Sequence, residues 1–391
     1  MPILRVPVVT VTKPPYRIPN VPEIAALAGT NGLTAVSTFA GAGGSSTGYR
    51  WAGYDVRWAS EFLTAAADSY EANWPSTTVD RRDVRDVGGE DVLAACGIAH
   101  GDLDLFDGSP PCQPFSSAGR REKNWRREIA HGDGTVNRGG SEDLVREWVR
   151  LIAEMRPRAA VMENVRGMTI GKAKGYLLEV LEAVRSLGYN AEARLLDGQW
   201  LGVPQRRVRV FVVAVRDDVG TPAWPAPLPY RYTIADACPW IVKADMRRWG
   251  TERTPIEVDE PSPTVVATGA AQNRPLVIVE NTEVGGFGNV ARIDPAREVA
   301  PTITASGHAT NTLRGASGDG CALDDEHHRA QTDGVAAPRK FTIAEVRRLC
   351  GFPDDYVLTG GYAEQWARLG NSVPPPMSRA VGLALAPVLA R

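Results

Sequence analysis

A short apolar run that ends in a glycine-rich stretch, followed by strand-like runs that alternate with helical segments, constrains this chain most. LTAVSTF at 33–39 leads into AGAGGSSTG at 40–48, which predicts a strand, a tight loop and a helix. Further strands are predicted at 54–61, 103–108, 158–165, 190–198 and 207–216, and helices at 65–70, 141–155 and 176–187. Such alternation predicts a largely parallel sheet with helices on both faces, so the fold class is α/β.

The alternation stops after residue 216, and helical spacing resumes at 339. Residues 217–338 are rich in Pro and Gly and carry only short β-like pieces, which predicts a smaller, irregular β-rich domain. Residues 1–30 are a Pro-rich N-terminal extension, and 31–216 are the large domain. The chain then returns to the large domain through C-terminal helices in 339–391, so the irregular domain is an insertion.

The composition excludes several classes of protein. With 43% hydrophobic and 23% charged residues, the 391-residue chain is not intrinsically disordered. Its 44 Lys and Arg nearly balance 46 Asp and Glu, so any nucleic-acid binding must come from local clusters. The longest apolar run is far shorter than the ~20 residues of a membrane helix, and Pro residues interrupt the N-terminus where a secretory signal needs a continuous apolar stretch. We therefore expect a cytoplasmic protein without membrane contact.

The glycine-rich loop predicts a nucleotide-like cofactor. Glu61 ends the second strand, 20 residues after Gly41, where a carboxylate can accept hydrogen bonds from ribose hydroxyls. The loop has no Walker lysine, so phosphate binding is not required. These residues alone leave NAD, FAD and S-adenosylmethionine open.

Cys112 differs in its setting from Cys96 and Cys350. All five are widely spaced without a C-x-x-C pair, so neither a disulfide framework nor a zinc site is expected, and no metal is predicted. Cys112 lies in GSPPCQPFSSAG (108–119), directly after a strand, where open α/β sheets bind ligands. Turn-forming and polar neighbours are typical of an accessible thiol that becomes a nucleophile when positive charge lowers its pKa. Cys96 and Cys350 are predicted to be small core residues.

Two further strand ends carry charged residues. Glu163 ends the run RAAVMENV, which places it at the same sheet edge as Cys112. In QRRVR, strand alternation puts Arg207 and Arg209 on one face. Two guanidiniums on one face suit an anion and an oriented carboxylate.

In this order, these blocks resemble the DNA cytosine-5 methyltransferase family. The matching blocks are FAGAGG (39–44), SEF with Glu61, RDV with Asp83, SPPCQPFS (109–116), ENV (163–165), QRRVR (205–209), FTIAEVRRLCGFPDDY (341–356) and GNSVPPP (370–376). The resemblance implies a bacterial or phage enzyme of the restriction-modification type. It also implies a Rossmann-like methyltransferase sheet in 31–216 and a target-recognition domain in 217–338.

The resemblance implies methylation of C5 of a cytosine turned out of a specific duplex sequence. Cys112 would be the thiolate that adds to C6, and Glu163 would donate a proton or hydrogen bond to N3. Arg209 would contact O2 and orient Glu163, and Arg207 would support the loop and the DNA backbone. The residues identify no base that removes the C5 proton.

The cofactor implied by the resemblance is S-adenosyl-L-methionine, which leaves as S-adenosyl-L-homocysteine. Phe39 would lie against the adenine, Glu61 would bind the ribose and Asp83 the adenine amino group. The other residues implied to line this pocket are Ala40, Gly41, Gly43, Gly44, Phe62, Val84, Pro111, Asn371, Ser372 and Val373.

The implied partner is double-stranded DNA. The basic segment GRREKNWRRE (119–128) is expected to be a mobile loop that grips phosphates. The insertion would read bases in the major groove, although its 10 Lys and Arg against 17 Asp and Glu require a contact face with segregated charge. The residues predicted to contact DNA are Gln113, Ser116, Arg120, Arg121, Lys123, Arg126, Arg127 and Thr302, with Arg274 and Arg314 as candidates for guanine contacts.

Thr302 is predicted because a threonine in a P-T-[IV] segment helps to anchor the recognition domain in the family. PTVVATG (263–269) and PTITASG (301–307) compete for this role, and we expect the second. We also expect a monomer, associated with the nucleoid through DNA. A separately acting cognate restriction endonuclease is a further candidate partner.

Other activities fit less well. A tRNA cytosine-5 methyltransferase shares the Cys112 and ENV blocks but needs no large base-reading insertion. A catalytically silent DNA-binding partner would not need Cys112, Glu163 and Arg209 together. A methyltransferase acting on N4 or N6 would carry an aromatic residue in place of Cys112, and a dinucleotide oxidoreductase would leave 341–376 without a role.

Overall fold

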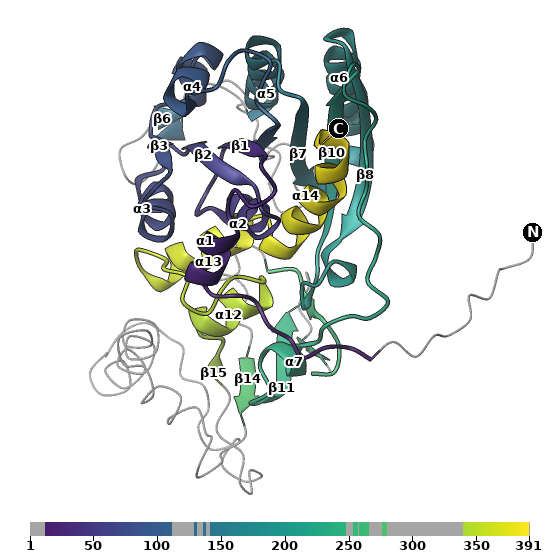
Figure 1. The fold of residues 1–391 in the computed structure, drawn as a ribbon. Helices are drawn as coiled ribbons and strands as arrows, with labels where there is room; N and C mark the ends of the chain where they lie inside the picture. The colour runs from purple at the N-terminus through teal and green to yellow at the C-terminus, as the bar shows by residue number, and fades with distance from the viewer. Residues whose placement is uncertain are drawn as a thin grey trace, which may run out of the picture.

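A seven-stranded sheet with helices on both faces forms the centre of the molecule (Figure 1). The computed structural model describes residues 12–111, 129–130, 136–137, 141–247, 253–256, 258–265, 276–279 and 339–390. In spatial order the strands are β3 (Thr78–Asp80), β2 (Asp55–Ser60), β1 (Thr34–Thr38), β4 (Leu105–Gly108), β7 (Ala159–Val165), β10 (Val208–Arg216) and β8 (Tyr189–Asp197). The predicted Rossmann-like α/β fold is confirmed.

The strand order reverses at the centre of the sheet, between β1 and β4. Strands β3, β2, β1, β4 and β7 run parallel, whereas β10 is antiparallel to both β7 and β8. The chain moves outward from β1 through β2 to β3, then returns to place β4 on the other side of β1. Open α/β sheets bind ligands at the carboxyl ends of strands beside such a reversal. The ends of β1, β4 and β7 are therefore the place to look for a site.

Three helices cover one face of the sheet: α4 (Gly89–Cys96), α5 (Ser141–Met155) and α6 (Lys172–Ser186). The predicted helix at 141–155 is confirmed as α5, and its apolar face is buried: Leu144, Val145, Trp148, Leu151 and Ile152. Trp148 stacks on Phe106 of β4 with ring centroids 6.1 Å apart. This face is therefore an apolar layer.

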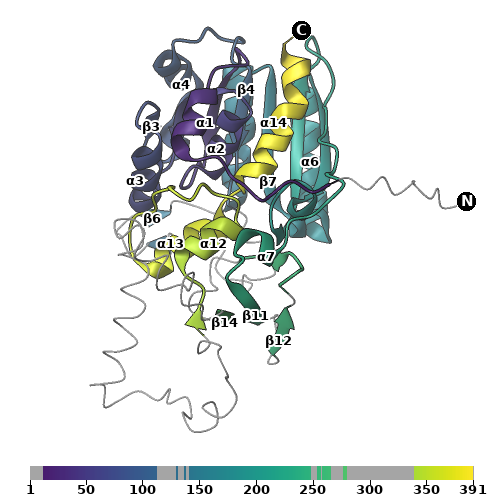
Figure 2. The same cartoon turned by 60° about the horizontal axis from the view of Figure 1, so that its bottom comes forward.

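The opposite face is covered by α2 (Gly44–Trp51) and α14 (Pro375–Leu389), which lie side by side (Figure 2). Gly48 permits the contact, because a Cβ atom at this position would overlap Ser378 and the carbonyl oxygen of Pro375. The buried side chains of α14 pack with those of α2 and the sheet in one cluster. The C-terminal helix thus returns to the first part of the chain.

A third apolar cluster joins helices from distant parts of the chain. They are α1 (Val21–Leu27), α3 (Thr64–Asn73), α7 (Ile234–Ala237), α12 (Ile343–Leu349) and α13 (Tyr362–Asn371). The N-terminal segment crosses this cluster: the Tyr16 hydroxyl donates a hydrogen bond to the Arg348 carbonyl at 2.7 Å, and Lys13 forms an ion pair with Asp236 at 2.6 Å. Residues 12–27 therefore connect α7 with α12.

A second sheet, with three of its four strands from residues 217–338, lies below the first (Figure 1). Its strands are β12 (Arg253–Ile256), β11 (Ile241–Arg247), β14 (Leu276–Val279) and β15 (Arg339–Lys340). Two short strand pairs are formed by β13 (Ser262–Pro263) with β9 (Gln205–Arg206) and by β5 (Ile129–Ala130) with β6 (Val136–Asn137). The described residues also include the 3-10 helices η1 (Val84–Asp86), η3 (Arg166–Thr169) and η4 (Gly198–Trp200). The β13–β9 pair connects the insertion to the large domain.

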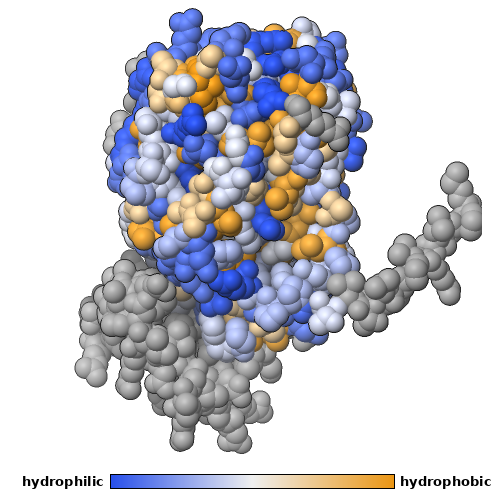
Figure 3. Space-filling view, viewed as in Figure 1, coloured by the Kyte–Doolittle hydropathy of each residue, from blue (hydrophilic) through white to orange (hydrophobic). Residues whose placement is uncertain are grey.

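On the face shown in Figure 3, hydrophobic residues occur in small groups between hydrophilic ones. Among the described residues, no helix has the length and apolar character to cross a bilayer.

Candidate active site

The glycine-rich loop after β1 is fixed by the carboxylate of Glu61. Its Oε2 accepts a hydrogen bond from the backbone N–H of Gly41, and its Oε1 accepts one from that of Leu63, both at 2.8 Å. Burial raises the pKa of Glu61, and the backbone donors oppose this effect. Phe39, directly before the loop, has a φ of 54°, which is uncommon for a residue other than glycine. The loop and the end of β2 are therefore one rigid unit.

The C-terminal part of the chain closes against this loop. A Cβ atom on Gly44 would overlap the carbonyl oxygen of Val373 and would lie 3.2 Å from Cβ of Ser372. Tyr356 donates a hydrogen bond to the carbonyl of Ala42 at 2.5 Å. Residues predicted from both ends of the sequence to line one pocket thus lie together.

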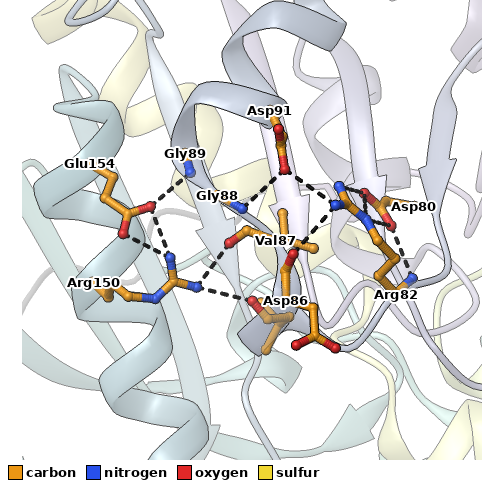
Figure 4. A network of polar contacts seen from close by, with 10 residues as sticks. Asp80, Arg82, Asp86, Val87, Gly88, Gly89, Asp91, Arg150 and Glu154 are labelled. Carbon is orange, nitrogen blue, oxygen red and sulfur yellow. Dashed lines mark hydrogen bonds and ion pairs between the residues drawn. The ribbon is translucent and has the colours of Figure 1, made fainter.

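Arg82 and Arg150 form a polar network around Asp86–Gly89 (Figure 4). The segment that contains Asp83 and Val84 directly precedes these residues. Arg150 of α5 donates hydrogen bonds to the carbonyls of Val84 and Val87 at 3.0 and 2.9 Å. The Asp83 carboxylate caps η1 and forms an ion pair with Arg85 at 2.8 Å. Asp83 therefore already has a cation partner on its own segment.

Glu163 and Arg209 form a buried ion pair at the end of β7. The register pairs Glu163 with Phe211 and Val165 with Arg209 on antiparallel β10, so both charged side chains project from the same sheet face. Arg209 Nε lies 3.0 Å from Glu163 Oε1. Within the described residues, this buried oxygen has no well-aligned hydrogen-bond donor. Burial raises the pKa of Glu163, whereas Arg209 and Arg207 lower it.

Asn164 connects this carboxyl to the cysteine loop. Its side-chain amide donates a hydrogen bond to the carbonyl of Pro110 at 3.3 Å, and its Oδ1 accepts one from the N–H of Val165 at 2.8 Å. Pro110 is two residues before Cys112. The loop therefore leaves β4 against the end of β7.

Several predicted residues lie outside the described part of the chain. They are Cys112, Gln113, Ser116, Arg120, Arg121, Lys123, Arg126, Arg127, Thr302, Arg274 and Arg314. Pro111 is described and exposed. Thr264, from the competing P-T-[IV] segment, donates a hydrogen bond to the carbonyl of Arg206 at 2.5 Å. Thr264 is thus a second candidate for the residue that anchors the recognition domain. The sequence indicates it through the P-T-[IV] motif of 263–269.

Arg207 is not placed to touch the DNA backbone, contrary to the sequence-based expectation. Its side chain is 1% exposed. The guanidinium donates hydrogen bonds to the carbonyls of Val265, Gly370 and Ser372 at 3.2, 3.0 and 2.6 Å. Burial and the nearby Arg209 lower its pKa to about 9. Arg207 therefore ties the insertion to the segment that closes the glycine-rich loop.

Replacing Arg207 by Met is expected to lower the free energy of unfolding by about 2–4 kcal/mol, because two buried carbonyl groups and a partly buried one lose a donor. Chemical denaturation measures this change. The matched control is Arg206→Met, since the neighbouring Arg206 side chain is exposed; it should change stability by less than about 0.5 kcal/mol. Equal stability of the two variants would contradict the assignment.

The sequence reasoning missed Asp107. This carboxyl is 2% exposed, and it accepts hydrogen bonds from Ser37, Ser45 and Tyr49. The sequence feature that could have identified Asp107 is its position as an acidic residue at the end of an apolar strand, directly before Gly108.

Comparison with known proteins identifies the family. Residues 33–386 match the family of C-5 cytosine-specific DNA methylases. The chain belongs to this family. It is a DNA cytosine methyltransferase, as the sequence blocks predicted. Among its relatives, the type II methyltransferase M.XorII of Xanthomonas oryzae is 29% identical, over 89% of this chain and 83% of that protein. M.NgoMIV of Neisseria gonorrhoeae is 26% identical, over 90% of this chain and 96% of that protein.

Solved structures agree on the fold of this methyltransferase. The S. pombe Dnmt2 methyltransferase superposes with a TM-score of 0.55 at 18% identity, over 91% of this chain and 99% of that one. A putative DNA modification methyltransferase encoded within an E. coli prophage gives a TM-score of 0.53 at 20% identity, over 92% and 100%. Within the described residues of the methyltransferase, no group of three His, Cys, Asp or Glu could hold a metal ion.

Proposed function

We propose that this methyltransferase transfers the methyl group of S-adenosylmethionine to C5 of a cytosine in duplex DNA, with Cys112 as the nucleophile that adds to C6. The observation that carries the proposal is the buried Glu163–Arg209 ion pair at 3.0 Å. It adjoins Asn164, which binds the loop leading to Cys112. A carboxyl, a guanidinium and a thiol would thus meet at one edge of the sheet.

Cytosine C5 is a poor nucleophile and must be activated. The Cys112 thiolate forms a bond to C6 while Glu163 donates its proton to N3, and the ring becomes an enamine with electron density at C5. Burial raises the pKa of Glu163, which favours the protonated acid that this step needs. Arg209 orients the carboxyl group of Glu163 through the ion pair. Arg209 is therefore a positioning residue and does not transfer a proton.

The residues around the glycine-rich loop fit S-adenosylmethionine, which supplies an electrophilic methyl group on a cationic sulfur. The buried carboxyls of Glu61 and Asp107 accept hydrogen bonds from Gly41 and Ser45 of this segment. The Ser46 hydroxyl is buried, with no partner among the described residues. Such an acidic lining suits a cation that carries no phosphate. Phe39, Glu61 and Asp83 would hold the adenosine, and 371–373 would close over it.

The cycle ends with elimination of the enzyme. After methylation, C5 carries both the new methyl group and its original proton. A base removes that proton, the electron pair re-forms the C5–C6 double bond, and Cys112 leaves as a thiolate. N3 returns its proton to Glu163, so the enzyme is restored.

The target base must leave the helix before this chemistry, at a cost of a few kcal/mol. The basic segment 119–128 would hold the opened duplex through its phosphates, so DNA binding should weaken steeply with salt. The insertion would read the bases, held to the large domain through β9–β13 and Arg207. Because M.XorII and M.NgoMIV are named type II methyltransferases, we place this enzyme in a restriction-modification system with a separate endonuclease.

The test uses long duplex DNA amplified with 5-fluorodeoxycytidine. Fluorine at C5 cannot leave as a proton does, so elimination stops and the enzyme should remain bound to DNA through denaturation when S-adenosylmethionine is present. Peptide mass spectrometry should place the bond at Cys112. With ordinary DNA, nucleoside analysis should detect 5-methylcytosine. A product methylated at N4 of cytosine or N6 of adenine, or methylation of tRNA alone, would contradict the proposal.

A further inference from the structure

Asp107 is a buried carboxyl that the proposed mechanism does not use. Its Oδ2 accepts hydrogen bonds from the hydroxyls of Ser37 at 2.8 Å and Ser45 at 2.7 Å, and its Oδ1 accepts one from Tyr49 at 3.1 Å. Among the described residues, it forms no ion pair with Lys or Arg. Within the described part of the chain, three hydroxyl donors and no cation therefore contact it.

The position of Asp107 relates it to the cofactor loops. It lies in β4, paired with Ser37 of β1 and Val161 of β7. Ser45, its partner from α2, is in the first turn of the helix directly after the glycine-rich loop. Asp107 is followed by Gly108, the last residue of β4, and by the start of the loop that leads to Cys112, in which Pro111 is predicted to line the cofactor pocket. Asp107 thus connects the bases of both loops.

Taken alone, the N-terminal end of α2 would be unfavourable for a cationic cofactor. The first turn of α2 presents the positive end of the helix dipole toward the loop, and the side chains of that turn are Ser45 and Ser46, which carry no charge. Burial raises the pKa of Asp107 to about 6, and the hydroxyls of Ser45, Ser37 and Tyr49 oppose that rise. The carboxyl is therefore mainly ionised at pH 8.

Among the described residues, two titrating groups act on Asp107. Glu163 on β7 raises its pKa, and Tyr49 on α2 donates a hydrogen bond to it. The pKa of Tyr49 is itself raised well above its usual value, by burial and by Asp107, so Tyr49 stays a neutral donor.

We propose that Asp107 determines cofactor charge specificity: its buried carboxylate offsets the positive end of α2 and favours S-adenosylmethionine, with its cationic sulfur, over the product S-adenosylhomocysteine, whose sulfur is neutral. The inference rests on the proposed function for the identity of the cofactor. It also gives a reason for product release. Transfer of the methyl group removes the positive charge on the cofactor sulfur, and with it the attraction to the Asp107 carboxylate. Asp107 is thus a specificity-determining residue and not a proton carrier.

The test compares the two ligands in the Asp107→Asn variant. Asparagine keeps the shape and one oxygen acceptor but removes the charge. By isothermal titration at pH 8, S-adenosylmethionine should bind about five- to tenfold more weakly than to the wild type, while the affinity for S-adenosylhomocysteine should change by less than about twofold. Sinefungin, which carries a protonated amine in place of the sulfonium, should follow S-adenosylmethionine.

The control is Tyr49→Phe, which removes one hydroxyl donor but keeps the carboxylate. This variant should leave the affinity ratio of the two ligands unchanged. Equal weakening of both ligands by Asp107→Asn would show that Asp107 only shapes the pocket, and no change in either affinity would equally overturn the proposal. Because binding is measured without DNA, a wild type that binds S-adenosylmethionine but does not form 5-methylcytosine would refute the proposed function and leave this test valid.

Discussion

Glu163→Gln should slow methyl transfer by at least about 100-fold, while the affinities for DNA and S-adenosylmethionine stay within a few-fold of the wild type. Glutamine matches glutamate in shape and keeps an oxygen beside Arg209. It cannot give a proton to N3, so the enamine would form without an acid. General acids typically contribute about 10²–10⁴-fold to a rate. Single-turnover kinetics with preformed enzyme–DNA complex separates this step from binding and product release.

The pH profile supplies a second readout for Glu163. Since the protonated carboxyl is the active form, the wild-type rate should lose the contribution of Glu163 as the pH rises through its pKa. Burial moves that pKa upward, against the opposing charges of Arg209 and Arg207. This descending limb should be absent in Glu163→Gln. A residue with a purely structural role would lower the rate at all pH values equally.

Glu192→Gln is the matched control, because Glu192 lies on the edge strand β8 with its side chain 46% exposed and pairs with Arg194. It loses the same charge at a distance from the proposed chemistry and should retain wild-type turnover. Turnover of Glu163→Gln equal to that of this control would remove Glu163 from the mechanism.

The sheet could be predicted because its signals are local. Apolar runs such as 103–108 and 158–165 are strands, and the glycine-rich loop directly follows β1. The direction of β10 could not be predicted, because VRVFVVAVR is apolar on both faces and reads alike for either orientation. Helix α1 was missed within the Pro-rich segment, although Asn20 and Glu23 form a capping box and Pro22 lies in the first turn.

The positions of site residues could be predicted from the sequence where a functional residue lies at the end of a predicted strand. Glu163 and Arg209 are near each other because they lie on paired strands. The role of Arg207 depends on the carbonyl groups of Val265 and Ser372, which lie 58 and 165 positions later in the chain. Strand alternation alone could therefore not reveal it. Asp107 was missed for a similar reason: its three hydroxyl partners come from β1 and α2, and an aspartate before glycine otherwise indicates a turn.

Cys112→Ser should abolish both methyl transfer and the denaturation-resistant adduct with 5-fluorocytosine DNA. A serine hydroxyl is far less acidic and less nucleophilic than a thiol, so it would not add to C6 at a measurable rate. Noncovalent DNA binding should persist, because one oxygen replaces one sulfur. Gel analysis after denaturation, together with counting of transferred tritiated methyl groups, measures both effects.

Cys350→Ser provides the contrast, because Cys350 is buried at the end of α12 and accepts a hydrogen bond from Gln205 at 3.5 Å. Burial raises the pKa of this thiol to about 11, so it stays protonated and is a poor nucleophile at neutral pH. The variant should therefore form the adduct as the wild type does, with at most a loss of stability. If instead Cys350→Ser lost the adduct while Cys112→Ser kept it, the covalent bond to the base would have to come from a different thiol, and the strand-end argument for Cys112 would fail.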